Sequence, residues 1–418
     1  MSASFARGAC PSLQAPMQTG DGLLARILPA GPMKLKALAG LCASARVHGN
    51  GMMEISARGS LQVRGLTPIT APPFAAAVSA LGIEISDGVL VIAGPLGDEP
   101  SALLDADTLA RELRQAIAAA GLALAPKVSV IVDGGGRLHL DALAADIRVR
   151  AVATADGPLL HIALAGDGAT AAPLGAIAPD EACNVVLHLL ASIAAHGPEA
   201  RAADVLRRGG IATFRDAIRT RIVLESSPPP RLPAEPVGTH CLKDDLYALG
   251  VGLAFGHAQA HTLRALTETA RAHGALWARP ALDRTLLLWP FKRTKVKTIR
   301  DEAGRLGFAV EPSDSRRRIV ACPGAPACAS GLIESRAIAA ALAQDLPLHG
   351  DRVVLHVSGC AKGCAYPATA PLTVVGTARG CGIVRDGTAR ATPSSYADPA
   401  GLDEEIDRII ETREVVHA

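Results

Sequence analysis

Apolar and polar positions follow the same order in two distant stretches of the chain, residues 35–94 and 263–322. Each stretch begins with apolar residues at helical spacing, then passes through a basic turn into a short apolar run. A second helix-like segment and another apolar run follow. Apolar residues three and four positions apart predict amphipathic helices, and short apolar runs between turn residues predict strands. Because the order of elements repeats, we expect an internal duplication.

Individual residues support the duplication at both ends of the first helix in each stretch. The helices begin with Leu-x-Ala-Leu, at Leu35 and Leu263, and end with a His-Gly pair, at His48 and His273. Glycine after a helix suits the left-handed C-terminal cap, so we expect a structural role for both histidines. The strands that follow are expected over residues 61–66 and 285–291.

A different pattern lies between and after these stretches. A helix is expected over residues 105–122, with Asp105 or Asp107 as its N-cap. Helices and strands alternate throughout, which is typical of an α/β (α+β) protein with mixed sheets. The remaining elements are expected in this order: strand, Gly-rich turn and strand over 127–140, a strand over 159–168, a helix over 180–197, a Pro-rich linker over 225–238, a helix over 331–346, strands over 352–359 and 370–376, and a helix over 401–413.

Composition narrows the possible functions. The 418 residues include 42 Lys and Arg against 40 Asp and Glu, a formal charge of +2, which argues against a nucleic-acid-binding protein. No apolar run reaches the ~18 residues of a membrane helix, and the N-terminal segment has no continuous apolar stretch typical of a secretory signal. We therefore expect a cytoplasmic protein, in a compartment where paired cysteines are more often metal or redox sites than disulfides.

Two short segments, ACPGAPACAS and HVSGCAKGCAYP, hold four of the nine cysteines. Cys322 and Cys328 form a C-x5-C pair, and Cys360 and Cys364 form a C-x3-C pair. Four soft thiolates from two loops suit a [4Fe–4S] cluster. The main alternative is a zinc site, although structural zinc ligands are usually spaced C-x2-4-C. The simplest alternative is that the four cysteines are buried thiols that bind no metal.

The surroundings of the pairs favour the cluster. Prolines and a glycine at 323–326 keep the first loop irregular, so that backbone N–H groups can face sulfur, and Ser330 is expected to open a helix whose positive end offsets negative charge. The strand before Cys360 is expected to place the second pair at its C-terminal end. We expect Cys42 and Cys183 in helix cores. The cysteines without such spacing are Cys10, Cys42, Cys183, Cys241 and Cys381.

The cysteine motifs, on a halved and repeated scaffold, resemble the siroheme sulfite and nitrite reductases along nearly the whole chain. The specific part is C-x5-C followed by S-G-C-x3-C-x-x-P, and residues 94–110 also resemble a linker of that family. The resemblance implies a [4Fe–4S] cluster held by the four cysteines, with Cys364 as the bridge to siroheme iron. It also implies four domains: ferredoxin-like repeat 1 over 15–98, a central α/β domain over 99–232, ferredoxin-like repeat 2 over 237–313, and a cluster-binding α/β domain over 314–418.

The chain departs from the reductases where they hold their small anion. Arg58 is kept in SARGS, but the Gln expected next is absent, and VLVIAG replaces a segment with an Arg-Asn pair. Of a Lys-x-Lys pair, Lys127 is kept and Ser129 stands in the second place. An apolar segment in place of basic side chains is poorly suited to holding a small anion for reduction.

One branch of the family, the precorrin-3B synthases, fits this pattern and is also similar in RILPAGPM and LQVRGLT. This resemblance implies that the hollow for a tetrapyrrole cofactor takes a tetrapyrrole substrate, precorrin-3A. It implies O2-dependent hydroxylation at C20 with γ-lactone formation, NADH in the overall equation, and a mononuclear non-haem iron beside the cluster. The alternatives are a siroheme-dependent nitrite or sulfite reductase, and a non-catalytic electron or tetrapyrrole carrier.

A substrate with many carboxylates calls for basic side chains in its pocket. The plainer interpretation of each candidate is a solvated surface charge, which we also expect for the basic runs FKRTKVK and SRRR. The candidates are Arg58, Arg64, Lys127, Arg137 after the turn VDGGGR, and Lys362 between the second pair of cysteines.

No iron ligands are assigned. His257 and His261 are four residues apart, which is more typical of a helix start than of a metal site, and His356 is expected to be a hydrogen-bonded core histidine. No nucleotide-binding glycine pattern is present, so we expect a separate reductase to supply electrons through the cluster.

Overall fold

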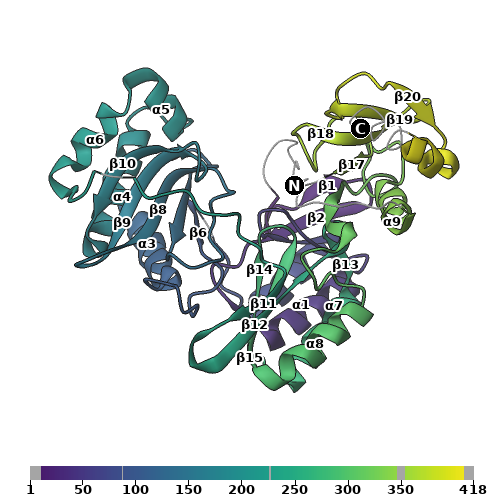
Figure 1. The fold of residues 1–418 in the computed structure, drawn as a ribbon, viewed down its shortest axis with the longest axis horizontal. Helices are drawn as coiled ribbons and strands as arrows, with labels where there is room; N and C mark the ends of the chain where they lie inside the picture. The colour runs from purple at the N-terminus through teal and green to yellow at the C-terminus, as the bar shows by residue number, and fades with distance from the viewer. Residues whose placement is uncertain (1–10, 87, 226, 346–353, 409–418) are drawn as a thin grey trace, which may run out of the picture.

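The computed structural model describes residues 11–86, 88–225, 227–345 and 354–408 (Figure 1). Within them, the strands form four five-stranded sheets. Two of these sheets, with their helices, form the base of the molecule in Figure 1, and the other two stand on opposite sides above it. In the part of the chain described, no helix is both long and apolar enough to cross a bilayer.

The two sheets of the base have the same construction. The first repeat contributes strands β1 (Met17–Thr19), β2 (Gly22–Ile27), β4 (Met52–Ile55) and β5 (Leu61–Leu66), and helices α1 (Leu35–His48) and α2 (Ala71–Ala80). The second contributes, in the same order, β11 (Gly238–Cys241), β12 (Leu246–Gly252), β14 (Trp277–Ala281) and β15 (Thr285–Lys292), and α7 (Ala260–Ala272) and α8 (Arg293–Arg305). The expected duplication is confirmed.

Each repeat completes the sheet of the other. Strand β13 (His257–Gln259), from the second repeat, pairs with β4, and β3 (Met33–Lys34), from the first, pairs with β14. The sheet orders are therefore β1-β2-β5-β4-β13 and β11-β12-β15-β14-β3. Helices α1 and α7 pack against each other, and buried residues of both repeats form one hydrophobic core. Neither repeat has a complete sheet or a complete core alone.

The boundaries of α7 correct one expectation. Helix α7 begins at Ala260, so the Leu-x-Ala-Leu segment lies one turn inside it rather than at its start. The expected helix start is found, since His261 lies in the first turn of α7 and His257 lies just before it in β13. The His-Gly pairs do end their helices, and His273 Nδ1 lies 3.0 Å from the carbonyl oxygen of Thr269.

The third sheet belongs to the middle of the chain. Asp105 is the N-cap of α3, since its carboxylate accepts from the N–H groups of Asp107 and Thr108. The sheet order is β10-β9-β8-β7-β6. Its elements are β6 (Leu90–Ala93), β7 (Ser129–Asp133), β8 (Ala145–Thr154), β9 (Gly157–Gly166), β10 (Ala172–Ile177), α3 (Ala106–Ala120), α4 (Ala182–Ala194), α5 (Ala202–Gly209) and α6 (Ala212–Ile218).

Two features of this sheet differ from expectation. Residues 137–140 form no strand: Leu138 is buried against the second repeat, and Leu140 packs with Ile131 of β7 and Ala145 of β8. Strand β6, on the first-repeat side of the expected boundary at 98, pairs in parallel with β7. The central sheet therefore begins before that boundary.

The fourth sheet carries the cysteines and has the order β16-β17-β18-β19-β20. Its first three strands are parallel neighbours, and the last pairings are antiparallel. A further helix is described over 402–408; the rest of the helix expected to reach 413 lies outside the described residues. The elements are β16 (Ile319–Ala321), α9 (Ser335–Asp345), β17 (Leu355–Ser358), β18 (Ala370–Thr377), β19 (Gly380–Gly387) and β20 (Ser395–Ala397).

The shared core of the base makes a prediction for Leu38, which is fully buried in α1. We expect Leu38→Ala to lower the free energy of unfolding by about 2–5 kcal/mol, the usual cost of such a cavity. Both tryptophans, Trp277 and Trp289, lie in the second repeat. Their fluorescence should nevertheless follow the loss, because the two repeats unfold together.

The matched control is Val47→Ala, on the same helix at a position that is 73% exposed. It should change the free energy of unfolding by less than about 0.5 kcal/mol. A tryptophan transition that keeps its wild-type midpoint in Leu38→Ala would contradict the single core.

Candidate functional site

The two cysteine loops lie at one edge of the fourth sheet. Cys322 directly follows β16, and Cys360 comes two residues after β17. Because β16 and β17 are parallel neighbours, their carboxyl ends lie side by side. The N–H of Cys322 donates to the carbonyl of Val357 at 3.2 Å, and the N–H of Gly359 donates to Cys322 Sγ at 3.0 Å. The second pair thus follows the end of its strand, as expected.

The first loop is packed so closely that glycine is required at its centre. Gly324 has φ +64°, and a Cβ there would lie 2.5 Å from the backbone nitrogen of Ser335. A Cβ on Gly331 would lie 2.5 Å from the backbone nitrogen of Ala325. The N–H of Cys328 donates to the Gly324 carbonyl at 2.7 Å. Backbone contacts thus fold the loop tightly between its two cysteines.

Helix α9 begins at Ser335, not at Ser330 as the sequence suggested. The reason is that residues 331–334 are held by other bonds: the N–H of Leu332 donates to the Gly359 carbonyl, and the N–H of Ala325 donates to the Ile333 carbonyl. The Ser335 hydroxyl lies 3.6 Å from Cys322 Sγ. The partial positive charge of a helix N-terminus therefore lies beside a thiol.

The four thiols are near enough to affect one another. The pKa of the Cys364 thiol is raised, first by burial and then by Cys360, Cys322 and Cys328, while Lys362 opposes the rise. The Lys362 ammonium donates to the Ser330 hydroxyl at 2.8 Å and so joins the two loops. Four thiolates at this site would need a positive centre to balance them.

Arg64 has a different position from the one expected of a substrate-binding residue. It is only 3% exposed, and its guanidinium donates to both carboxylate oxygens of Asp21 at 3.0 and 2.7 Å. The same group donates to the carbonyl of Ala327, in the first cysteine loop, at 2.6 Å. Arg64 fixes the loop to the first repeat, and its burial keeps it from a substrate carboxylate.

Arg58 lies in the exposed turn between β4 and β5, and its guanidinium has no protein partner in the described structure. With Gly59 it lines a narrow cavity whose other walls include the apolar β6, residues 90–93, and Arg279. The structure therefore brings Arg58 together with the apolar segment that replaces basic residues of the reductases.

Lys127 and Arg137 lie at opposite ends of β7, and both are exposed. Lys127 precedes Ser129, which lies opposite Leu90 in the parallel pair of β7 and β6. The backbone N–H of Arg137 donates to the Glu99 carboxylate. Neither residue makes a hydrogen bond or ion pair with the cysteine loops within the ranges that the structure describes.

Sequence reasoning was wrong about His356. Burial in β17 was expected and is complete, yet neither ring nitrogen has a hydrogen-bond partner among the described residues. The ring meets Tyr366, after the second cysteine pair, edge to face at a centroid distance of 5.9 Å. Burial, and then the charge of Arg284, lowers the pKa of His356 to about 4, so the imidazole is neutral. The alternation of apolar and polar residues along a strand predicts that His356 is buried. It does not predict that the ring nitrogens lack hydrogen-bond partners.

Over residues 11–86, 88–225, 227–345 and 354–408, no group of three or more His, Cys, Asp or Glu side chains is arranged to hold a single metal ion. Cys42 is buried in α1 as expected, while Cys183 is only partly buried on α4. Cys10 lies outside the described residues.

Crowding at Gly324 can be tested against Gly82, which follows α2 with φ +66° and where a Cβ would have no atom within 4 Å. Alanine at either site should cost about 1–2 kcal/mol for the left-handed backbone. We expect Gly324→Ala to cost a further ~1–3 kcal/mol because its methyl group meets backbone atoms. Denaturant unfolding of the two variants measures the difference, and equal losses would show that the loop is not crowded.

Comparison with known proteins adds the following relationships, although no family model matches the chain. A precorrin-3B synthase from Sinorhizobium sp is 36% identical over 412 residues, which cover 97% of this chain and 89% of that protein. A ferredoxin–nitrite reductase from Synechococcus elongatus is 25% identical over 399 residues, covering 86% of this chain and 77% of that protein.

The Mycobacterium tuberculosis NirA protein has a similar structure, with a TM-score of 0.71 and 19% sequence identity over 93% of this chain and 80% of that one. The expected sulfite/nitrite reductase-like fold is therefore confirmed. The relatives make the chain an oxidoreductase. Near full-length similarity at 36% identity shows that the chain belongs to the precorrin-3B synthase family.

Proposed function

We propose that this chain catalyses O2-dependent hydroxylation of precorrin-3A at C20, with γ-lactone formation, in aerobic cobalamin biosynthesis. The similarity to a precorrin-3B synthase over nearly the whole chain supports this function. The observation that carries it is the convergence of two cysteine loops at one sheet edge, where Lys362 of one loop bonds Ser330 after the other.

The donor set fits a [4Fe–4S] cluster held by Cys322, Cys328, Cys360 and Cys364. The loops that carry the thiols meet at one sheet edge, the N–H of Gly359 faces one sulfur, and the start of α9 adds partial positive charge. When bound, such a cluster would supply single electrons. The chain's own role is to fix the four thiols and to hold their loops against the first repeat through Arg64.

A mononuclear iron, which the family resemblance implies, has no assigned ligands. The described residues offer no group of three suitable side chains arranged for one ion. Siroheme belongs only to the alternative function, as a reductase.

Substrate binding is assigned to the basic groups that have free donors. Arg58 has no protein partner among the residues described, and Lys362 keeps two of its three ammonium hydrogens after bonding Ser330. Both would pair with peripheral carboxylates of the macrocycle while the apolar β6 faces its rings. Lys127 and Arg137 remain candidates for outer carboxylates, and Arg64 is withdrawn.

The ligand assignment is tested with Cys364→Ser. We expect loss of most acid-labile sulfide and iron from anaerobically purified protein, because a hydroxyl is a poor replacement for a thiolate in binding soft metal. The matched control is Cys241→Ser, at an exposed thiol of β11. It should retain the wild-type content, and an intact cluster in Cys364→Ser would refute the assignment.

The reaction is tested by incubating the protein with precorrin-3A, 18O2 and a reductase with its electron donor. We expect a hydroxylated lactone that carries 18O, formed only when the reductase is present. A separate reductase is part of the proposal, so steady NADH oxidation by the pure protein would contradict that part. A bound chlorin with rapid nitrite or sulfite reduction, and no oxygenated product, would favour the reductase function instead.

A further inference from the structure

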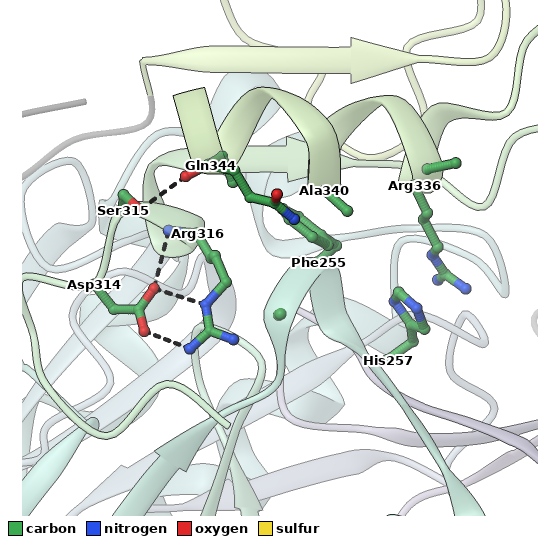
Figure 2. A pocket seen from close by; sticks show the side chains of 11 residues that line it. Phe255, His257, Asp314, Ser315, Arg316, Arg336, Ala340 and Gln344 are labelled. Carbon is green, nitrogen blue, oxygen red and sulfur yellow. Dashed lines mark hydrogen bonds and ion pairs between the residues drawn. The ribbon is translucent and has the colours of Figure 1, made fainter. Parts of the chain in front are cut away.

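A second cavity, of about 830 Å³, lies between α9 and a segment of the second repeat that includes Phe255 and His257 (Figure 2). Its walls come from η4 (Ala254–Gly256) and β13 of the second repeat, from η5 (Ser315–Arg318), and from α9. The volume is within the range of small-molecule sites. None of its lining residues belongs to the cysteine loops or to the cavity beside Arg58. It is therefore a separate candidate site.

The middle of this cavity is apolar. Phe255 forms one wall, and α9 presents alanines at 337, 340 and 343 toward the space. Figure 2 shows Phe255 and Ala340 between two polar ends. Small side chains on one face of the helix leave room beside the aromatic ring, so a flat apolar group can pack there.

One polar end is already satisfied. Arg316 donates to both carboxylate oxygens of Asp314, at 2.9 and 2.6 Å, and to the carbonyl of Gly307 at 2.7 Å. The SRRR segment was expected to be a run of solvated charges. This was wrong for Arg316, because its guanidinium bonds nearby acceptors. The Arg316 end needs no ligand to pair its charge.

The other end has polar atoms without partners in the described part of the chain. Figure 2 shows the side chains of Arg336 and His257 side by side there. Arg336 donates to the Glu54 carboxylate at 2.6 Å, but its buried Nε has no acceptor among the described residues, and the buried Nδ1 of His257 has no partner there either. An unmade hydrogen bond at a buried polar atom costs free energy that a bound acceptor or donor recovers.

The cation that lines this end of the cavity is Arg336, whose guanidinium is paired with Glu54. Glu54 is shared between Arg336 and Arg64, whose guanidinium lies 3.7 Å away. Arg64 is also paired with Asp21, so each of the two guanidinium groups has a carboxylate partner. Arg284, which pairs with the Asp283 carboxylate at 3.5 Å, adds a further buried cation that acts on Arg336. Burial, and then Arg336, lowers the pKa of His257 to about 4, so its ring is neutral and adds no charge.

We propose that this cavity binds an organic anion, with its carboxylate or phosphate on the Nε–H of Arg336 and its apolar body between Phe255 and the alanines of α9. The unpartnered Nδ1 of His257 lies at the same end and is a second polar contact for this ligand. Neither contact uses a group assigned to the macrocycle.

The probes are phenylacetate, phenyl phosphate and the neutral phenylacetamide, titrated by calorimetry into the purified cluster-loaded protein. We expect millimolar or tighter binding of at least one anion and at least tenfold weaker binding of the amide. The stronger of the two anions identifies the carboxylate or phosphate class. Equal binding of phenylacetamide, or no binding of either anion, would overturn the proposal.

Two α9 variants locate the bound probe. Ala340→Leu fills the cavity and should weaken binding at least tenfold, whereas Ala341→Leu, the same change at the exposed next residue, should leave it unchanged. Arg336→Lys keeps a cation beside Glu54 but removes Nε–H, and should also weaken binding about tenfold. Wild-type affinity in Ala340→Leu or in Arg336→Lys would contradict this site, whatever the outcome of the turnover assay.

Discussion

The parallel pairing of β16 with β17 is the constraint on which the site depends. Parallel neighbours end at the same sheet edge, so Cys322 and Cys360 are brought together although a helix and a crossover separate them in sequence. A slip of the β17 register would move Gly359 away from Cys322 Sγ and remove a backbone donor that faces a sulfur. The position of the thiols thus follows from backbone hydrogen bonds.

The duplicated base holds this edge in place. Arg64 bonds the first cysteine loop, and Glu54 of the same sheet bonds Arg336 of α9, so two buried contacts join the first repeat to the cluster-binding part. The sheet that carries Arg64 is itself completed by β13 of the second repeat. Both repeats are therefore needed to position the cysteines, which explains why a site of four thiols requires so large a scaffold.

Much of this arrangement could be predicted from the sequence, since periodicity and cysteine spacing are local signals. The repeats, the Asp105 cap and the second cysteine pair after a strand are examples. The exchange of β3 and β13, the buried role of Arg64, the unusual surroundings of His356 and the later start of α9 could not be predicted. Each depends on a contact between residues far apart in the chain, and neither propensity nor composition encodes such a partner.

The central claim is that the four cysteine sulfurs of the two loops ligate one iron–sulfur cluster. The most direct measurement is iron anomalous scattering from a crystal of anaerobically prepared protein. The account predicts one compact iron density within bonding distance of Cys322, Cys328, Cys360 and Cys364. A single zinc ion at the loops, or iron bound elsewhere with these sulfurs unligated, would contradict it.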